Sequence, residues 1–212
     1  MNYNNIKLIL WDYGGVLTYS PFLNIKDFEE FSNIEQNSII KINSNKPFVN
    51  AWAKLEKNLI SFCEFSCLFK EEAKSIGINH IDPIKLLQCL EVSLNKRMVL
   101  LLKKIAKKYD CACLTNNFKN HFSKKNSSTF NRIKNNFDYI FESSKLGIRK
   151  PEKEIYLYVL KKMRVKPEEI LFIDDLGINL KPARELGFIT YKFRKTEDTI
   201  EFFKNNLSKL NG

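Results

Sequence analysis

Short apolar runs of four to six residues recur along the chain, and polar or charged residues bound each of them. Runs of this length, rich in Ile, Leu and Phe, are typical of strands that are buried on both faces of a sheet. We therefore predict five strands. They occupy residues 6–11, 111–115, 137–141, 170–174 and 188–193.

Amphipathic segments with helical spacing lie between or beside these strands. Pro151 fits the first turn of a helix that runs to about residue 163, and Gly187 fits the end of another. Strands that alternate with helices indicate a parallel, doubly wound sheet. We predict an α/β fold with a Rossmann-like core. Its other helices are expected over residues 97–109, 178–186 and about 196–209.

The stretch between the first and second strands has a different character. Its apolar residues recur at helix-like intervals among charged residues, and it shows no clear strand pattern. Asp82 followed by Pro83 is typical of a helix start. We predict an all-helical insertion at residues 18–95, and we assign residues 1–17 and 96–212 to the Rossmann-like core.

The composition indicates a folded globular protein. The chain has 212 residues, of which 44% are hydrophobic and 13% aromatic, enough for one core and a second small one. It has no apolar stretch of about 18 uncharged residues, so no membrane partner is expected. The N-terminus lacks a signal-peptide pattern, from which we expect a cytoplasmic protein. Five cysteines, an odd number, argue against a disulfide framework.

The chain is strongly basic, with 35 Lys and Arg against 24 Asp and Glu and a net charge of +11. Such a balance suits a phosphorylated small molecule, a nucleic acid or an anionic surface, and it is also found on lysine-rich solvated surfaces. The basic residues are scattered and form no basic-aromatic motif. This pattern argues against a nucleic acid as the partner.

Polar side chains follow three of the predicted strands. In an open parallel sheet, ligands bind at the carboxyl ends of the strands, so these side chains are expected to converge. Carboxylates that lie close together repel one another, which makes a hard cation such as Mg²⁺ their natural partner. Lys150, farther along, would bring a fixed positive charge. The side chains that follow the strands are Asp12, Thr115, Asn116, Asp174 and Asp175.

The order of these residues resembles the four motifs of the haloacid dehalogenase-like (HAD) superfamily. Residues 12–17 resemble the first motif, 114–116 the second, 150–151 the third and 172–175 the fourth. The likeness covers the Rossmann-like part, about two-thirds of the chain, and the insertion resembles a helical cap of the C1 type. Residues 147–152 resemble the bacterial α-D-glucose-1-phosphate phosphatases and related Gly-Gly-Val-Leu proteins.

The resemblance implies a magnesium-dependent phosphatase of a small phosphorylated metabolite, such as a sugar phosphate or a nucleotide. Asp12 would attack phosphorus and form an aspartyl-phosphate, while Lys150 neutralises charge in the transition state. The implied ligands of Mg²⁺ are Asp12, the backbone carbonyl of Gly14, Asp174 and Asp175, and the implied phosphate-binding residues are Thr115, Asn116 and Lys150.

Gly14 departs from the family pattern. Most HAD phosphatases have an aspartate there that protonates the leaving oxygen and later activates water, and losing such a group costs about 10²–10⁴-fold in rate. Three explanations are open: a substrate with a good leaving group, such as an anomeric or acyl phosphate; a substitute group from the cap; or a slow or inactive protein that binds a phosphate-bearing ligand. The resembled sugar-phosphatase subgroup is catalytic with glycine at this position, which favours activity.

A metal-free 2-haloacid dehalogenase is a further alternative. Those enzymes also lack the second aspartate, but they do not usually carry a paired acid such as Asp174-Asp175. The pair therefore favours a metal-dependent phosphatase.

Overall fold

The computed structural model describes residues 3–119 and 129–207. In this part of the chain, a five-stranded sheet has the order β3-β2-β1-β4-β5, and all of its pairings are parallel. The order reverses beside β1, so the predicted doubly wound parallel sheet is confirmed. The strands are β1 (Leu8–Trp11), β2 (Asp110–Thr115), β3 (Tyr139–Glu142), β4 (Ile170–Asp174) and β5 (Ile189–Lys192).

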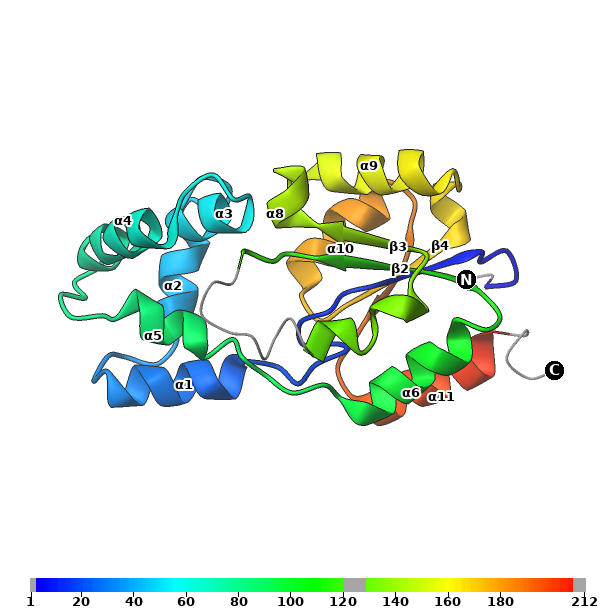
Figure 1. The fold of residues 1–212 in the computed structure, drawn as a ribbon, viewed down its shortest axis with the longest axis horizontal. Coiled ribbons are helices and arrows are strands. Elements are labelled where there is room, and N and C mark those ends of the chain that lie inside the picture. The colour runs from blue at the N-terminus through cyan, green and yellow to red at the C-terminus, as the bar shows by residue number, and fades with distance from the viewer. Residues whose placement is uncertain (1–2, 120–128, 208–212) are drawn as a thin grey trace.

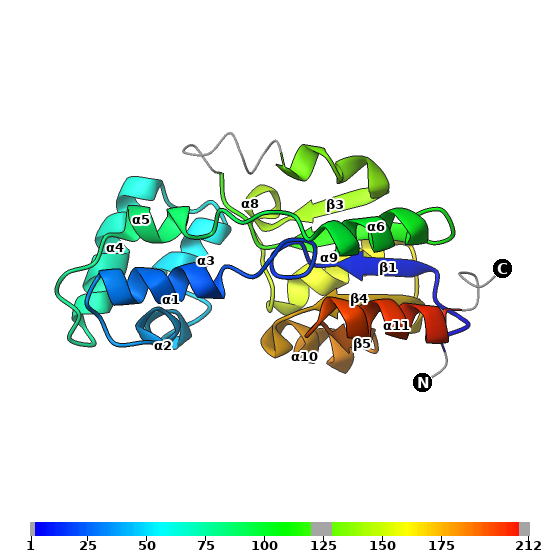
Figure 2. The same ribbon diagram turned by 90° about the horizontal axis from the view of Figure 1, so that it is seen from below.

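Helices cover both faces of the sheet (Figures 1 and 2). They are α6 (Lys96–Ile105), α9 (Lys153–Met163), α10 (Gly177–Glu185) and α11 (Thr196–Asn206). Leu8 and Leu10 belong to the apolar cluster that α9 and α10 complete, whereas Ile9 and Trp11 belong to the cluster that α6 and α11 complete. This alternation has the period of a strand. Burial on both faces explains why the strands read as continuous apolar runs.

Several boundaries differ from the sequence prediction. β1 begins at Leu8 and not at 6, and α6 ends at Ile105 and not at 109. Pro151 does not lie in the first turn of α9, because extended backbone at Glu152 separates it from the first helical residue, Lys153. β3 begins at Tyr139 and not at 137, because Phe137 still closes a short 3₁₀ turn. One further helix, α8 (Ser143–Leu146), was not predicted.

The segment between β1 and α6 forms helices, as predicted, and they share an apolar cluster of their own. Asp82 caps the last of these helices by accepting hydrogen bonds from the backbone N–H groups of Ile84 and Lys85. These helices lie beyond the carboxyl ends of the strands (Figure 2). They are α1 (Phe22–Phe31), α2 (Ser38–Ser44), α3 (Ala51–Glu56), α4 (Phe62–Lys74) and α5 (Pro83–Gln88).

The two chain segments that lead into and out of this helical insertion run side by side. Thr18 and Leu94 form an antiparallel β-bridge, and the backbone N–H of Asn95 donates to the carbonyl of Leu17 at 2.9 Å. The insertion therefore leaves and re-enters the sheet at nearly one point. Among the described helices, none combines the length and the apolar character needed to cross a membrane.

Candidate active site

Three neighbouring strands bring the predicted site residues to one edge of the sheet. β1 lies between β2 and β4, and Trp11 is in register with Cys113 on one side and Ile173 on the other. The backbone N–H of Asp12 continues this ladder, because it donates to the carbonyl of Ile173 at 2.9 Å. The parallel register therefore places Asp12 level with the ends of both neighbouring strands.

Three carboxylates converge at this edge. Asp12, Asp174 and Asp175 each offer one carboxylate oxygen, and these oxygens all lie within 4.8 Å of one another. Asp12 and Asp174 are buried and Asp175 is half-buried. The sequence prediction that these side chains meet is thus confirmed by the geometry of the described residues.

The electrostatics of this acid cluster suit a divalent cation. Burial, together with the negative charges of Asp174 and Asp175, raises the pKa of Asp12 well above its ordinary value. Burial and the charge of Asp174 likewise raise the pKa of Asp175 to about 6. Oxygen donors that repel one another in a shielded pocket bind Mg²⁺ well, because the cation removes the repulsion. The residues present therefore fit a magnesium ion.

Lys150 provides the positive charge inside the cluster. Its Nζ lies 2.7 Å from Oδ1 of Asp12 and 2.8 Å from Oδ2 of Asp174, and the side chain is only 1% exposed. Burial alone would lower the pKa of this amine, but the two carboxylates outweigh burial and raise the pKa above its ordinary value. The position between the two acids therefore favours the charged ammonium form of Lys150.

The turn after β1 contains two glycines, and only one of them must be glycine. Gly15 has a φ of +74°, and a Cβ at this position would lie 2.3 Å from Oδ2 of Asp175. Only glycine allows both this conformation and this close approach. Gly14 is exposed, and a Cβ there would meet nothing within 4 Å. The position where an acid is missing is thus open space beside Asp12.

Thr115, the last residue of β2, and Asn116, which follows it, make different contacts. The side chain of Asn116 pairs with the backbone of Lys150 in both directions: Nδ2 donates to the Lys150 carbonyl and Oδ1 accepts from the Lys150 N–H, each at 2.9 Å. Asn116 therefore fixes the segment that carries the lysine. Thr115 is buried at the end of β2, beside Asp12 in the sheet. Phosphate binding by these two residues, and metal binding by the carbonyl of Gly14, stay predictions.

Two further residues support the cluster, and the sequence alone assigned them no role. Asn179 Nδ2 donates to both carboxylate oxygens of Asp174 at 3.0 Å. The hydroxyl of Tyr156 donates to the carbonyl of Asn179 at 2.7 Å, which fixes the first turns of α10. The signal available in the sequence was a polar residue on the buried face of a helix one turn after the acid pair.

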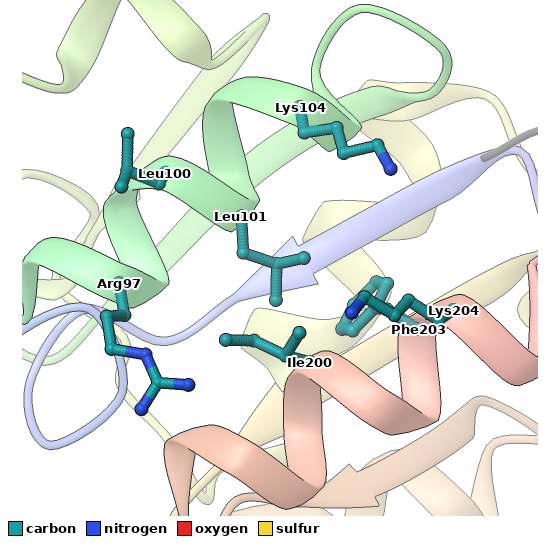
Figure 3. Close-up of a pocket in the computed structure, with 7 residues that line it drawn as sticks. All are labelled: Arg97, Leu100, Leu101, Lys104, Ile200, Phe203 and Lys204. Atoms are coloured by element: carbon teal, nitrogen blue, oxygen red, sulfur yellow. The ribbon is translucent and has the colours of Figure 1, made fainter. Parts of the chain in front are cut away.

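The pocket shown in Figure 3 lies elsewhere. It is a hollow of about 250 Å³ between α6 and α11, and its lining contains no carboxylate and no residue of the acid cluster. This hollow is therefore separate from the acid cluster at the carboxyl ends of the strands. Its lining residues are Arg97, Leu100, Leu101, Lys104, Ile200, Phe203 and Lys204.

Sequence comparison places this architecture among known proteins. A family model described as haloacid dehalogenase-like hydrolase matches residues 6–187. Bifunctional epoxide hydrolase 2 of Mus musculus is 29% identical over 171 residues, which cover 75% of this chain and 30% of that protein. Glyceraldehyde 3-phosphate phosphatase of Methanocaldococcus jannaschii is 34% identical over 82 residues, which cover 35% of this chain and 36% of that protein. The chain spans only 18% to 30% of the length of four of the curated relatives that it matches.

Structural comparison gives the same grouping. The magnesium complex of HAD family enzyme BT-2542 from Bacteroides thetaiotaomicron superposes with a TM-score of 0.68 at 26% identity. The superposition covers 95% of this chain and 100% of that chain, so it includes the helical insertion as well as the sheet.

Proposed function

The chain belongs to the haloacid dehalogenase-like hydrolase family, and from this premise we propose that it is a magnesium-dependent phosphatase of a small phosphorylated metabolite. One observation carries the proposal: three carboxylates converge, and one buried lysine pairs with two of them. One relative is a glyceraldehyde 3-phosphate phosphatase, and one structural neighbour was crystallised as a magnesium complex. Both are consistent with phosphate chemistry at this cluster.

Asp12 is the nucleophile in this proposal. Its carboxylate oxygen forms a bond to phosphorus as the bond from phosphorus to the leaving oxygen breaks, which gives an aspartyl-phosphate. Water then attacks phosphorus, the bond to Asp12 breaks, and inorganic phosphate leaves. Dividing the displacement in this way replaces one difficult step by two easier ones.

The charges around Asp12 prepare the site for an anionic substrate. Lys150 faces both Asp12 and Asp174, so its ammonium group offsets negative charge where the phosphoryl group would arrive. Asp12, Asp174 and Asp175 would hold Mg²⁺, with the backbone carbonyl of Gly14 as a further proposed ligand. When bound, the cation would screen the nucleophile from the phosphate charge and polarise the phosphoryl oxygens.

Gly14 shapes the choice of substrate. It offers no proton to the leaving oxygen, so water must supply that proton when the leaving group is a poor one. We therefore place phosphates with good leaving groups, such as anomeric sugar phosphates and acyl phosphates, first among the candidate substrates. Thr115 and Asn116 complete the proposed phosphate-binding residues.

The helical insertion would act as a cap. We assign residues 18–95 to the cap and residues 1–17 and 96–212 to the core. The insertion lies beyond the carboxyl ends of the strands (Figure 1), so its movement would admit substrate and exclude bulk water during the reaction.

Beryllium fluoride, a mimic of the aspartyl-phosphate, tests this proposal. In ¹⁹F NMR with Mg²⁺ present, we expect bound fluoride resonances from the wild-type protein and none from Asp12→Asn. Bound resonances that persist in the variant would remove Asp12 as the nucleophile. Turnover of a 2-haloacid in the presence of a chelator would instead identify a metal-free dehalogenase.

A further inference from the structure

Two ion pairs join the helical insertion to the chain segment that carries Lys150. Oε2 of Glu56 lies 2.6 Å from Nε of Arg149, and Nζ of Lys57 lies 2.8 Å from Oε1 of Glu152. Glu56 ends α3 and Lys57 follows it, whereas Arg149 and Glu152 flank Lys150 along the chain. We name these four residues, Glu56, Lys57, Arg149 and Glu152, the clasp.

The clasp is shielded from solvent. The four side chains are only 11% to 16% exposed. By contrast, an ion pair within the insertion, Lys41 with Glu35, has side chains that are 54% and 77% exposed. Exposed pairs contribute little because water and salt screen them, whereas shielded pairs fix geometry and are costly to break. The clasp therefore belongs to the class of ion pair that constrains its neighbours.

Both oxygens of the Glu56 carboxylate have a neighbour. Nε1 of Trp52 donates to Oε1 of Glu56 at 3.0 Å, whereas Oε2 meets Nε of Arg149 as an ion pair, without a hydrogen bond between these two buried atoms. Arg149 extends farther into the insertion, because its Nη1 donates to the carbonyl of Pro47 at 2.9 Å. Glu56 and Arg149 are thus held in one orientation from both sides.

A second route connects Glu56 to the same lysine. The hydroxyl of Ser143 donates to the Glu56 carbonyl at 2.8 Å and accepts from the backbone N–H of Asn117 at 2.9 Å. The preceding residue, Asn116, pairs with the backbone of Lys150 in both directions. Two routes therefore connect the end of α3 with Lys150. One is the ion pair of Glu56 with Arg149, the residue before Lys150. The other is the set of hydrogen bonds through Ser143 and residues 116–117. Figure 1 shows α3 beside α8, where Ser143 lies.

We propose that Glu56 and Arg149 are positioning residues that couple the seating of the insertion to the placement of Lys150. When the insertion is seated, both routes hold the segment 149–152, and the Lys150 ammonium group stays within 2.8 Å of both carboxylates. When it lifts, Arg149 and Glu152 lose their partners in the insertion, and this segment keeps only its contacts with the core. The inference rests on the proposed function, in which Lys150 meets the phosphoryl group.

A double-mutant cycle with two readouts tests the coupling. The variants are Glu56→Gln, Arg149→Gln and the double variant, with Glu35→Gln as the matched control in the exposed pair. In Glu56→Gln and Arg149→Gln, we expect kcat to fall about 10- to 100-fold with KM within about threefold of wild type, because small displacements of a charged group cost that much. The double variant should be no slower than the slower single variant, and Glu35→Gln should match wild type.

The second readout does not depend on activity. Amide hydrogen exchange at Lys150, whose N–H donates to Asn116, should accelerate at least tenfold in both single variants and stay unchanged in Glu35→Gln. Faster exchange with an unchanged kcat would show that the clasp is a structural contact only, which would overturn the proposal. Unchanged exchange at Lys150 would overturn it as well, because the clasp would then not hold this residue. If the wild-type protein released no phosphate, the proposed function would fail by itself, and the exchange data would still decide whether the clasp holds Lys150.

Discussion

The Nζ atom of Lys150 lies 2.7 Å from Oδ1 of Asp12, and the same ammonium group lies 2.8 Å from Asp174. This lysine is therefore the cation that the described residues provide at the centre of the acid cluster. Its burial makes the cluster sensitive to any change in charge, because charges in a shielded pocket are screened little by solvent.

Replacing Lys150 by methionine should destabilise the metal-free protein by about 3–5 kcal/mol at pH 7, because two buried carboxylates would lose their partner. Mg²⁺ should restore part of the loss. Urea unfolding with chelator and with Mg²⁺ measures both effects. Lys7→Met is the control, since Lys7 is 62% exposed in its pair with Glu169 and should cost no more than about 1 kcal/mol. Equal losses in the two variants would contradict the role given to Lys150.

Gly15→Ala should disrupt the acid cluster. The added Cβ would lie 2.3 Å from Oδ2 of Asp175 at a φ of +74°, so the turn or the carboxylate must move. We expect a loss of about 1–3 kcal/mol in the free energy of unfolding and at least a tenfold loss in Mg²⁺ affinity by calorimetric titration. Gly14→Ala, with no atom within 4 Å of its Cβ, is the matched control. The prediction fails if the two alanine variants bind Mg²⁺ alike.

Gly14→Asp should supply the missing acid. A Cβ at Gly14 would meet no atom within 4 Å, so a side chain can begin there without a clash. For alkyl phosphates, which are poor leaving groups, we expect kcat/KM to rise about 10²-fold, whereas a nitrophenyl ester should change little. Gly14→Asn has nearly the same shape and cannot protonate the leaving oxygen. An equal gain in both variants would show that the effect is not acid catalysis.

Asp175 should make the metal-free protein less stable as the pH rises. Burial and the charge of Asp174 raise its pKa to about 6, above its ordinary value of 3.8. Between those values the folded state holds a proton that the unfolded chain has lost, so stability is higher near pH 4 and falls as the pH approaches 6.

The contribution of Asp175 to stability is measured by unfolding in the presence of chelator, with wild type and Asp175→Asn compared from pH 4 to 7. The variant should become the more stable of the two toward pH 7, by on the order of 1–2 kcal/mol. A wild-type protein that gains stability over the variant as the pH rises would show that the carboxylate is not repelled.

The strands and their parallel arrangement could be predicted, because burial on both faces leaves a direct mark on the sequence and helices alternate with the strands. Residues 8–11 and 170–173 are apolar throughout, and an aspartate follows each of them. The convergence of Asp12 with Asp174 followed from the parallel sheet alone. The start of α9 after Pro151 could not be predicted in this way. Glu152 has an extended backbone and pairs with Lys57, a residue far away in sequence, and no local pattern marks such a contact.

The supporting contacts of the site could not be predicted. Asn179 donates to the carboxylate of Asp174, five residues earlier in the chain. Ser143 donates to the backbone carbonyl of Glu56, which lies 87 residues away in sequence. No local periodicity marks such partners, because each is set by how helices pack on the sheet. The assignment of residues 18–95 to a cap stays a prediction, because it states that this segment moves to admit substrate.

The proposed phosphatase activity is tested by phosphate release with Mg²⁺ from a panel of sugar phosphates, nucleotides and a nitrophenyl ester, run beside Asp12→Asn. We expect release that requires both Mg²⁺ and Asp12, with a drop of at least about 10³-fold in the variant. Release that is the same in the variant, or that persists in chelator, would contradict the proposal. No release above the Asp12→Asn background across the panel would also contradict it and favour a protein that binds a phosphate-bearing ligand without turnover.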